Sequence, residues 1–324
     1  MMGKLTHAVA VALAVMALAR PAAAQDFPSR PITFVVPLGA GGVMDVIARV
    51  VGPKLSDRLG RPVVIENRTG GGTVIGAQAV ARATPDGHTL LFAPSGTLTT
   101  NVTLYKALPY DPVKDFVPIA LYAKIPFVLV VNPSLPVQSV ADLIKLAKTK
   151  QLSYASTGTG AVPHMAGELL KSMTGVEMTH VPYRGVTQTL TDVIAGHVSM
   201  TFASPDSAMP AIKDGRVRTL GVSSLSRVPV LPDVAPIAES GLPGFEAVSW
   251  HLIVAPAGTP APVVNLLHRE LKRITAAPEM QRMIGDMGLI AVDTPPVEEL
   301  KRFLATEIAL WGKLVQQAGI AGSQ

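Results

Sequence analysis

Short apolar runs alternate with amphipathic segments along almost the whole of this chain of 324 residues. The apolar runs have the length and composition of buried strands, and the segments between them have the periodicity of helices. Alternation of this kind is typical of parallel sheets with helices on both faces, because each crossover must return over the sheet. The sequence therefore predicts an α/β fold.

The residue patterns also locate the individual elements. Strands are predicted at 32–38, 62–67, 88–94, 117–123, 127–133, 152–156, 178–183, 198–203, 218–223 and 251–256. Helices are predicted at 43–59, 74–83, 140–149, 164–173, 187–195, 263–276 and 297–317. Gly60 and Gly196 each follow a predicted helix where a left-handed cap would end it, and Ser139 with Asp142 resembles a capping box.

A chain of this length exceeds what one hydrophobic core usually serves, so two lobes are expected. Two long extended segments, 120–136 and 244–260, have the character of crossings from one sheet into the other. They divide the chain into a first lobe of residues 25–125 and 250–324 and a second lobe of residues 126–249. Each lobe is expected to hold a mostly parallel sheet flanked by helices.

The N-terminal residues have the pattern of an export signal. Lys4 precedes an unbroken run of Ala, Val, Leu and Met from residue 8 to residue 19. This run is shorter than the roughly 20 apolar residues of a membrane-spanning helix, but it has the length of a signal-peptide core. Ala22, Ala23 and Ala24 then offer a small-residue cleavage pattern. We predict that residues 1–24 are a signal peptide and that the protein acts in the periplasm; an uncleaved anchor or a buried first helix is the alternative.

Composition narrows the chemistry of the mature chain. No cysteine is present, which rules out disulfides and thiolate metal sites. Without Lys4 and Arg20, 26 of the 28 basic side chains remain against 23 acidic ones, a formal charge of +3. The basic residues are scattered and aromatic residues are few, so no nucleic-acid partner is expected. A small anionic ligand fits this mild charge better, because a cleft can focus a field without a large net charge.

A glycine-rich turn, Gly39 to Gly42, follows the first predicted strand and precedes a helix. Backbone N–H groups at such a helix start bind anions, either phosphates or carboxylates. A dinucleotide fingerprint would need a further glycine where Met44 stands, although Glu66 ends the next strand where a ribose-binding acid would lie. We therefore favour a carboxylate over a nicotinamide cofactor, and we expect no cofactor.

A second turn of the same kind lies in the other lobe. The sequence "YASTGTGAVPHMAGELL" gives a strand, the hydroxyl-rich and glycine-rich residues 156–160, and a helix opened by Pro163. We expect the two turns, one from each lobe, to face each other across a cleft and to hold a carboxylate between them. The structural alternative is that strand-to-helix turns in this fold class favour glycine whatever they bind.

Several segments together resemble one family over essentially the whole mature chain. They include "PSRPITFVVPLGAGGVMDVIAR", "VVIENRTGGG", "ATPDGHTLLFAPSGT", "HVPYRG" and "LPDVAPIAESGLPGFEAVSW". In order and spacing they are similar to the Bug-type extracytoplasmic substrate-binding receptors of tripartite tricarboxylate transporters. The resemblance implies a two-lobed periplasmic binding-protein fold that closes on a small carboxylate and delivers it to a permease of two integral membrane subunits. A receptor that feeds a sensor kinase is the alternative within this class.

The resemblance also implies that loops of both lobes bind the ligand, largely through backbone amides and hydroxyl groups. The implied ligand-binding residues are Gly39, Ala40, Gly41, Gly42, Asp45, Ser95, Gly96 and Thr97 in the first lobe, and Ser156, Thr157, Gly158, Thr159, Gly160, His164, Tyr183, Arg184, Gly185, Ser204, Asp206 and Ser207 in the second. The chain departs from the family pattern at 38–40, at Met44 and at 203–206. These departures leave the identity of the ligand open.

Some of these residues have more than one interpretation. Asp45 has the position of a helix cap. His164 and Glu168 stand four residues apart on one helix face, where a hydrogen-bonded pair is favoured over a metal site because no third ligand is in view. Arg184 is either a carboxylate clamp or a more distant source of positive charge. No G-x-S-x-G motif or paired carboxylates accompany the glycine turns, so the sequence predicts a binding protein without catalytic residues.

Overall fold

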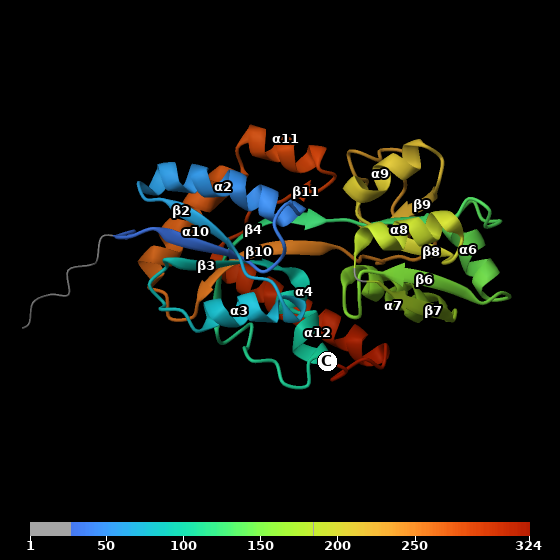
Figure 1. Ribbon diagram of the computed structural model, residues 1–324, viewed down its shortest axis with the longest axis horizontal. Coiled ribbons are helices and arrows are strands. Elements are labelled where there is room, and N and C mark those ends of the chain that lie inside the picture. Colours follow the sequence, from blue (N-terminus) through green and yellow to red (C-terminus); the bar gives the residue numbers. More distant parts are fainter. Residues whose placement is uncertain (1–26, 184) are drawn as a thin grey trace, which may run out of the picture.

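The computed structural model describes residues 27–183 and 185–324. The chain forms two α/β lobes that lie side by side, each with one sheet between helices (Figure 1). The predicted signal peptide, residues 1–24, and Arg184 lie outside the described residues. Within the described ranges, no helix combines the length and the apolar character needed to cross a membrane.

The sheet of the first lobe has six strands. Their order is β11 (Ile290–Ala291), β4 (Phe116–Ile125), β10 (Ser249–Pro256), β3 (Thr89–Pro94), β1 (Ile32–Val36) and β2 (Val63–Asn67). One face carries α2 (Val43–Leu59), α10 (Ala261–Thr275) and α11 (Pro278–Asp286); the other carries α3 (Val74–Ala81), α4 (Ser95–Leu98) and α12 (Val297–Gln317). Successive side chains of β1 point to opposite faces of the sheet: Phe34 packs against α2, and Val35 packs towards α3.

The sheet of the second lobe has five strands. Their order is β7 (Met178–Pro182), β6 (Leu152–Ser156), β8 (Met200–Ala203), β5 (Val128–Val131) and β9 (Arg218–Val222). One face carries α6 (Val140–Ala147) and α7 (Val162–Thr174); the other carries α8 (Val186–Ala195) and α9 (Pro205–Lys213). Short helices α5 (Thr100–Leu104), η1 (Gly71–Thr73) and η2 (Ile237–Ser240) complete the described elements.

The two-lobed α/β prediction is confirmed, and each of the ten predicted strands is present. The sheets are mixed rather than mostly parallel. The pairs β1–β2, β1–β3, β6–β7 and β6–β8 are parallel, whereas β10 and β5 pair antiparallel with both of their neighbours. Crossing strands cause this difference, because a strand that arrives from the other lobe enters its sheet from the opposite end.

Helices α4, α5, α9 and α11 were not predicted from the sequence. Two of them are only four and five residues long, too short to show a helical period. Helix α9 contains Pro210 in its interior, a residue that normally argues against a helix. Predicted end signals are present at Gly60 and Gly196, which have φ of 70° and 78° at the ends of α2 and α8.

Helix α12 belongs to both lobes. Leu300 and Leu304 near its start lie in the core of the first lobe, whereas Trp311, Leu314 and Val315 lie in the core of the second. Figure 1 shows the helix, in red, beneath the junction of the lobes. The predicted boundary placed all of 250–324 in the first lobe; the last turns of α12 instead contact the second.

The carboxylate of Glu307 on α12 links strand β10 of the first lobe to the part of α12 that packs in the second lobe. Glu307 Oε2 accepts hydrogen bonds from the indole N–H of Trp250 on β10, at 2.7 Å, and from that of Trp311, at 3.0 Å. Both indole rings are buried, and they are the two tryptophans of the sequence. Loss of this acceptor would leave two buried donors without a partner.

We predict that Glu307→Ala lowers the free energy of unfolding by about 1–3 kcal/mol, the usual cost of unsatisfied buried donors. Glu307→Gln, which keeps an amide oxygen, should cost less. Urea unfolding followed by tryptophan fluorescence measures this directly, with Glu299→Ala on the same helix as the control, since Glu299 is exposed. An unchanged midpoint in Glu307→Ala would show that the two indole hydrogen bonds to Glu307 contribute nothing to stability.

Candidate ligand-binding site

Two adjoining cavities lie between the lobes. The larger, here called the first chamber, has a volume of about 580 Å³, and the smaller, the second chamber, about 260 Å³. Both are lined by Leu38, Pro94, Phe127, Ser204 and Ser249. Because the chambers share these residues, they are neighbours, and residues of both lobes line each of them.

The predicted site residues divide between the chambers. The first is lined by Ser95, Gly96, Thr97, Thr157, Gly158, Thr159, Gly160 and Ser204. The second is lined by Gly39, Gly42, Asp45, Ser204 and Asp206. Neither is lined by Ala40, Gly41, Ser156, His164, Tyr183, Gly185 or Ser207. Arg184 lies outside the described residues, so its predicted role stays a prediction.

The backbone amides of the loop between β6 and α7 differ in whether they are hydrogen-bonded within the protein. The Gly158 amide donates to Ser156 Oγ at 3.1 Å, and the Gly160 amide donates to His164 Nδ1 at 3.0 Å. No hydrogen bond from the amides of Thr157 or Thr159 to another described residue is present. Both threonines line the first chamber, so their N–H and hydroxyl groups remain available to a ligand.

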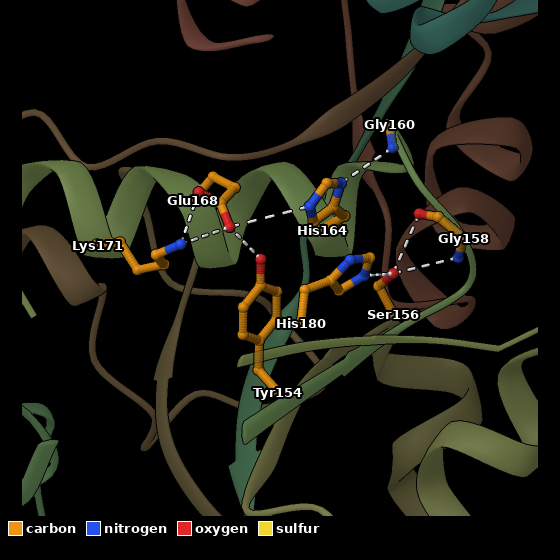
Figure 2. Close-up of polar contacts among 8 residues, drawn as sticks. All are labelled: Tyr154, Ser156, Gly158, Gly160, His164, Glu168, Lys171 and His180. Carbon is orange, nitrogen blue, oxygen red and sulfur yellow. Dashed lines mark hydrogen bonds and ion pairs between the residues drawn. The ribbon is translucent and has the colours of Figure 1, made fainter. Parts of the chain in front are cut away.

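A buried polar network supports this loop from behind (Figure 2). The rings of His164 and His180 are stacked with centroids 3.7 Å apart, and His180 Nε2 hydrogen-bonds Ser156 Oγ at 2.6 Å. On the other side, Glu168 accepts hydrogen bonds from Tyr154 and from Lys171. Ser156 and His164 therefore position the ligand loop without lining the chamber themselves.

The predicted hydrogen bond between His164 and Glu168 is wrong. His164 Nε2 lies 3.9 Å from Glu168 Oε1, which is too far for a hydrogen bond, and that oxygen instead accepts from Tyr154 and Lys171. Within the described residues, no group of three or more His, Cys, Asp or Glu side chains is placed to hold a metal ion.

Burial keeps both stacked histidines neutral. Desolvation, followed by the charge of Lys171, lowers the pKa of His164 to about 4. Desolvation, followed by the neighbouring His164, lowers the pKa of His180 to about 4. Neutral His164 keeps a lone pair on Nδ1, which is the form that can accept the Gly160 N–H.

Hydrogen bonds within the first lobe hold the loop that precedes α2. Asp45 Oδ2 accepts the Gly41 amide and Arg49 Nε, both at 2.9 Å, and Asp45 Oδ1 accepts Asn67 Nδ2 at 3.0 Å. These bonds, led by the one from Arg49 and then that from Gly41, lower the pKa of Asp45 to about 2. The Gly41 amide is thus occupied, and the two predicted glycine turns border different chambers instead of closing on one group.

Other predicted side chains turn away from the cleft. The Tyr183 hydroxyl donates to Asp192 Oδ2, and Ser207 Oγ donates to the carbonyl of Ser204 at 2.8 Å. Tyr183 thus bonds the second half of α8, and Ser207 bonds the N-cap residue of α9, so neither hydroxyl lines a chamber.

Several lining residues were missed in the sequence. Phe127 and Ser249 come from the two crossing segments, whose ends meet at the floor of the cleft. Gly72 and Thr73 belong to a tight turn in which residues 70–73 all have positive φ, between 53° and 126°. A run of three glycines at 70–72 was the available signal for this turn.

The Thr73 conformation is unusual, because a threonine with φ of 79° is strained. Its hydroxyl pairs with Thr97 Oγ1, while Asn101 Nδ2 and the Tyr105 hydroxyl bind the Gly72 and Gly71 carbonyls at 3.2 and 2.9 Å. These bonds hold the turn at the wall of the first chamber. Strained backbone of this kind is typical of ligand sites.

The N-termini of three helices border the cleft, and they differ in whether an acidic residue stands in their first turn. The starts of α2, α7 and α9 line the chambers, and none is capped by the side chain of its N-cap residue. Asp45 and Asp206 stand in the first turns of α2 and α9 at the second chamber, whereas α7 has no acid in its first turn. In the part of the chain that the structure describes, no Asp, Glu, Lys, Arg or His side chain lines the first chamber.

We predict that stability falls as pH decreases from about 6.5 towards 4. Unfolded histidines gain protons near pH 6.5, whereas His164 and His180 gain them near pH 4, so acid favours the unfolded state in this window. His251, whose pKa burial lowers to about 3, contributes in the same direction. The midpoint of thermal unfolding measured from pH 8 to pH 4 checks this.

His180→Asn should make that decline shallower, because one titrating group is removed while a polar partner for Ser156 is retained. Replacement of the exposed His197 by Asn is the matched control and should leave the slope unchanged. An equally steep decline in His180→Asn would contradict the assignment.

Comparison with known proteins agrees with the fold and the cleft. A family model described as the tripartite tricarboxylate transporter family receptor matches residues 47–320. A UPF0065 protein from a tcbD–tcbE intergenic region of Pseudomonas sp. (strain P51) is 41% identical over 301 residues, which cover 92% of this chain and 89% of the relative.

Solved structures agree as well. A protein of R. palustris with adipate has a TM-score of 0.80 at 36% identity, covering 91% of this chain and 99% of that one. MatC from Rhodopseudomonas palustris with bound malate has a TM-score of 0.76 at 33% identity, covering 89% and 100%. The periplasmic binding protein BugD also has a TM-score of 0.76 at 33% identity, covering 91% and 99%.

These matches confirm the Bug-type resemblance and favour a solute-binding protein over an enzyme that uses a nicotinamide cofactor at the glycine turn. The similar proteins are solute-binding proteins and not enzymes. The chain belongs to the receptor family of tripartite tricarboxylate transporters.

Proposed function

We propose that this protein binds a small organic carboxylate between its lobes in the periplasm and delivers it to the membrane subunits of a tripartite tricarboxylate transporter. The observation that carries the proposal is the start of α7. Its N-terminus and the free amides of Thr157 and Thr159 border a chamber whose described lining contains no acidic side chain. An anion gains there from the helix dipole and from these donors, and no acidic side chain of the described lining opposes it.

The energies favour a ligand held by many weak contacts. A helix N-terminus contributes roughly 0.3–1 kcal/mol to binding an anion, and up to about 2 kcal/mol when partly buried. A hydrogen bond to a charged group adds about 1.5–3 kcal/mol. Ser95 and Thr97 from the first lobe line the same chamber as Thr157 and Thr159 from the second, so closure of the lobes would bring polar residues of both lobes to one ligand.

The relatives support both the ligand class and the role in transport. The R. palustris protein and MatC were solved with adipate and with malate, which are both carboxylates. The family description names a transporter rather than a sensor kinase, so we propose transport over sensing. The predicted signal peptide and the description of BugD as a periplasmic binding protein support the proposed location.

Thermal unfolding in the presence of candidate ligands tests the proposal. The panel comprises succinate, malate, adipate, citrate, glutamate, benzoate and NADH. A ligand that binds only the folded state at a hundredfold excess over its Kd adds about 2.7 kcal/mol of stability. We expect a shift with at least one carboxylate and none with NADH; a shift with NADH alone would overturn the proposal.

Replacement of Gly158 by alanine tests the second-lobe loop. Gly158 has φ of +128°, so a side chain there would strain the backbone that presents Thr157 and Thr159. We expect Gly158→Ala to weaken binding of the best carboxylate at least tenfold in calorimetric titration.

The matched control is Gly215→Ala. Gly215 also has a positive φ, of +66°, with open space around it, and it does not line either chamber. Both variants carry backbone strain, but only Gly158→Ala should lose affinity. Equal affinities in the two variants would show that the loop does not hold the ligand.

A further inference from the structure

The second chamber differs in chemistry from the first. It is lined mainly by apolar side chains, among them Val43, Met44, Ile125, Phe127 and Leu289. Leu289 and Met44 are buried in the core of the first lobe, so this wall is part of the packed fold. Phe127 and Ser249 line both chambers, so the second chamber lies directly beside the first, within the reach of a ligand that extends past these two residues.

The ionisable groups at the second chamber are either negative or neutral. Asp45 is buried and ion-paired with Arg49 at 2.9 Å. Asp206 is exposed and faces the same chamber from the start of α9. His251 is buried and hydrogen-bonded to the Tyr122 hydroxyl, and burial lowers its pKa to about 3, so it is neutral at physiological pH.

The helix N-termini reinforce this contrast between the chambers. At the second chamber the positive ends of α2 and α9 each already carry a carboxylate in their first turn, Asp45 and Asp206. At the first chamber the positive end of α7 has none. A ligand carboxylate is therefore favoured at α7, whereas a second carboxylate reaching the other chamber would meet apolar walls and the charge of Asp206.

We propose that the second chamber receives the apolar end of a monocarboxylate, and that Asp206 selects against ligands with a second carboxylate at that end. The inference rests on the proposed function, because it assumes that the first carboxylate binds at α7. It narrows the ligand class to acids with an apolar body, and it separates this protein from the relatives solved with adipate and malate, which are dicarboxylates.

Two acids of equal length provide the test. Hexanoate and adipate both have six carbons and differ only in whether the far end is a methyl group or a carboxylate. Calorimetric titration of the full mature protein with each acid gives the ratio of affinities. We expect hexanoate to bind at least tenfold more tightly, and binding to strengthen about fourfold for each CH₂ added from butyrate to hexanoate.

The variant Asp206→Asn tests whether the charge of Asp206 causes the selection against a second carboxylate. This variant removes the charge and keeps the shape, and it should lower the ratio of hexanoate affinity to adipate affinity about tenfold. The control is Asp233→Asn, since Asp233 is exposed and lines neither chamber; it should keep the ratio of the parent protein.

Each outcome decides the proposal. Adipate binding as tightly as hexanoate, or an unchanged ratio in Asp206→Asn, would overturn the inference while leaving the carboxylate receptor intact. Failure of both six-carbon acids would also overturn it, and the shorter acids of the thermal panel would then show whether the proposed function survives.

Discussion

The antiparallel pairing of β4 with β10 is the constraint on which the rest of the structure depends. One strand leads out of the first lobe and the other leads back, so their ladder holds the two crossings side by side, with Ser249 opposite Ile125. Ser249 at the end of this ladder and Phe127 just beyond it line both chambers of the cleft. Glu307 then ties β10 to α12 through Trp250 and Trp311, which joins the cores of the two lobes.

The two glycine-rich turns at the cleft differ in the hydrogen bonds of their amides and in whether an acid stands at the start of the helix that follows. Neutral, buried histidines support the loop before α7, and its Thr157 and Thr159 amides have no hydrogen-bond partner among the described residues, whereas the Gly41 amide before α2 is bonded to Asp45. Two turns of the same type, each glycine-rich and followed by a helix, therefore differ in which of their amides are bonded within the protein. The proposed carboxylate position is at α7, whose first turn has no acid, and the apolar chamber lies beside α2, whose first turn carries Asp45.

The strands and the long helices could be predicted, because periodicity and glycine or proline signals are local. The predicted bounds of α2 and α12 agree with the structure, and Ser139 caps α6 through the Asp142 amide at 3.1 Å. The loops of the site were located too, but not the direction of their side chains. Tyr183 and Ser207 bond within their own lobe, while Phe127 and Ser249 carried no motif that would mark them.

The sequence by itself determined the two-lobed α/β class, the family, the glycine turns and the absence of thiol chemistry, since these depend on residue type and spacing. Only the tertiary structure decided that the two turns border separate chambers, that Gly41 is occupied by Asp45, and that Asp206 faces an apolar wall. The physical reason is that donors and charges act over a few ångströms, and those distances are set by how the lobes and crossings pack together.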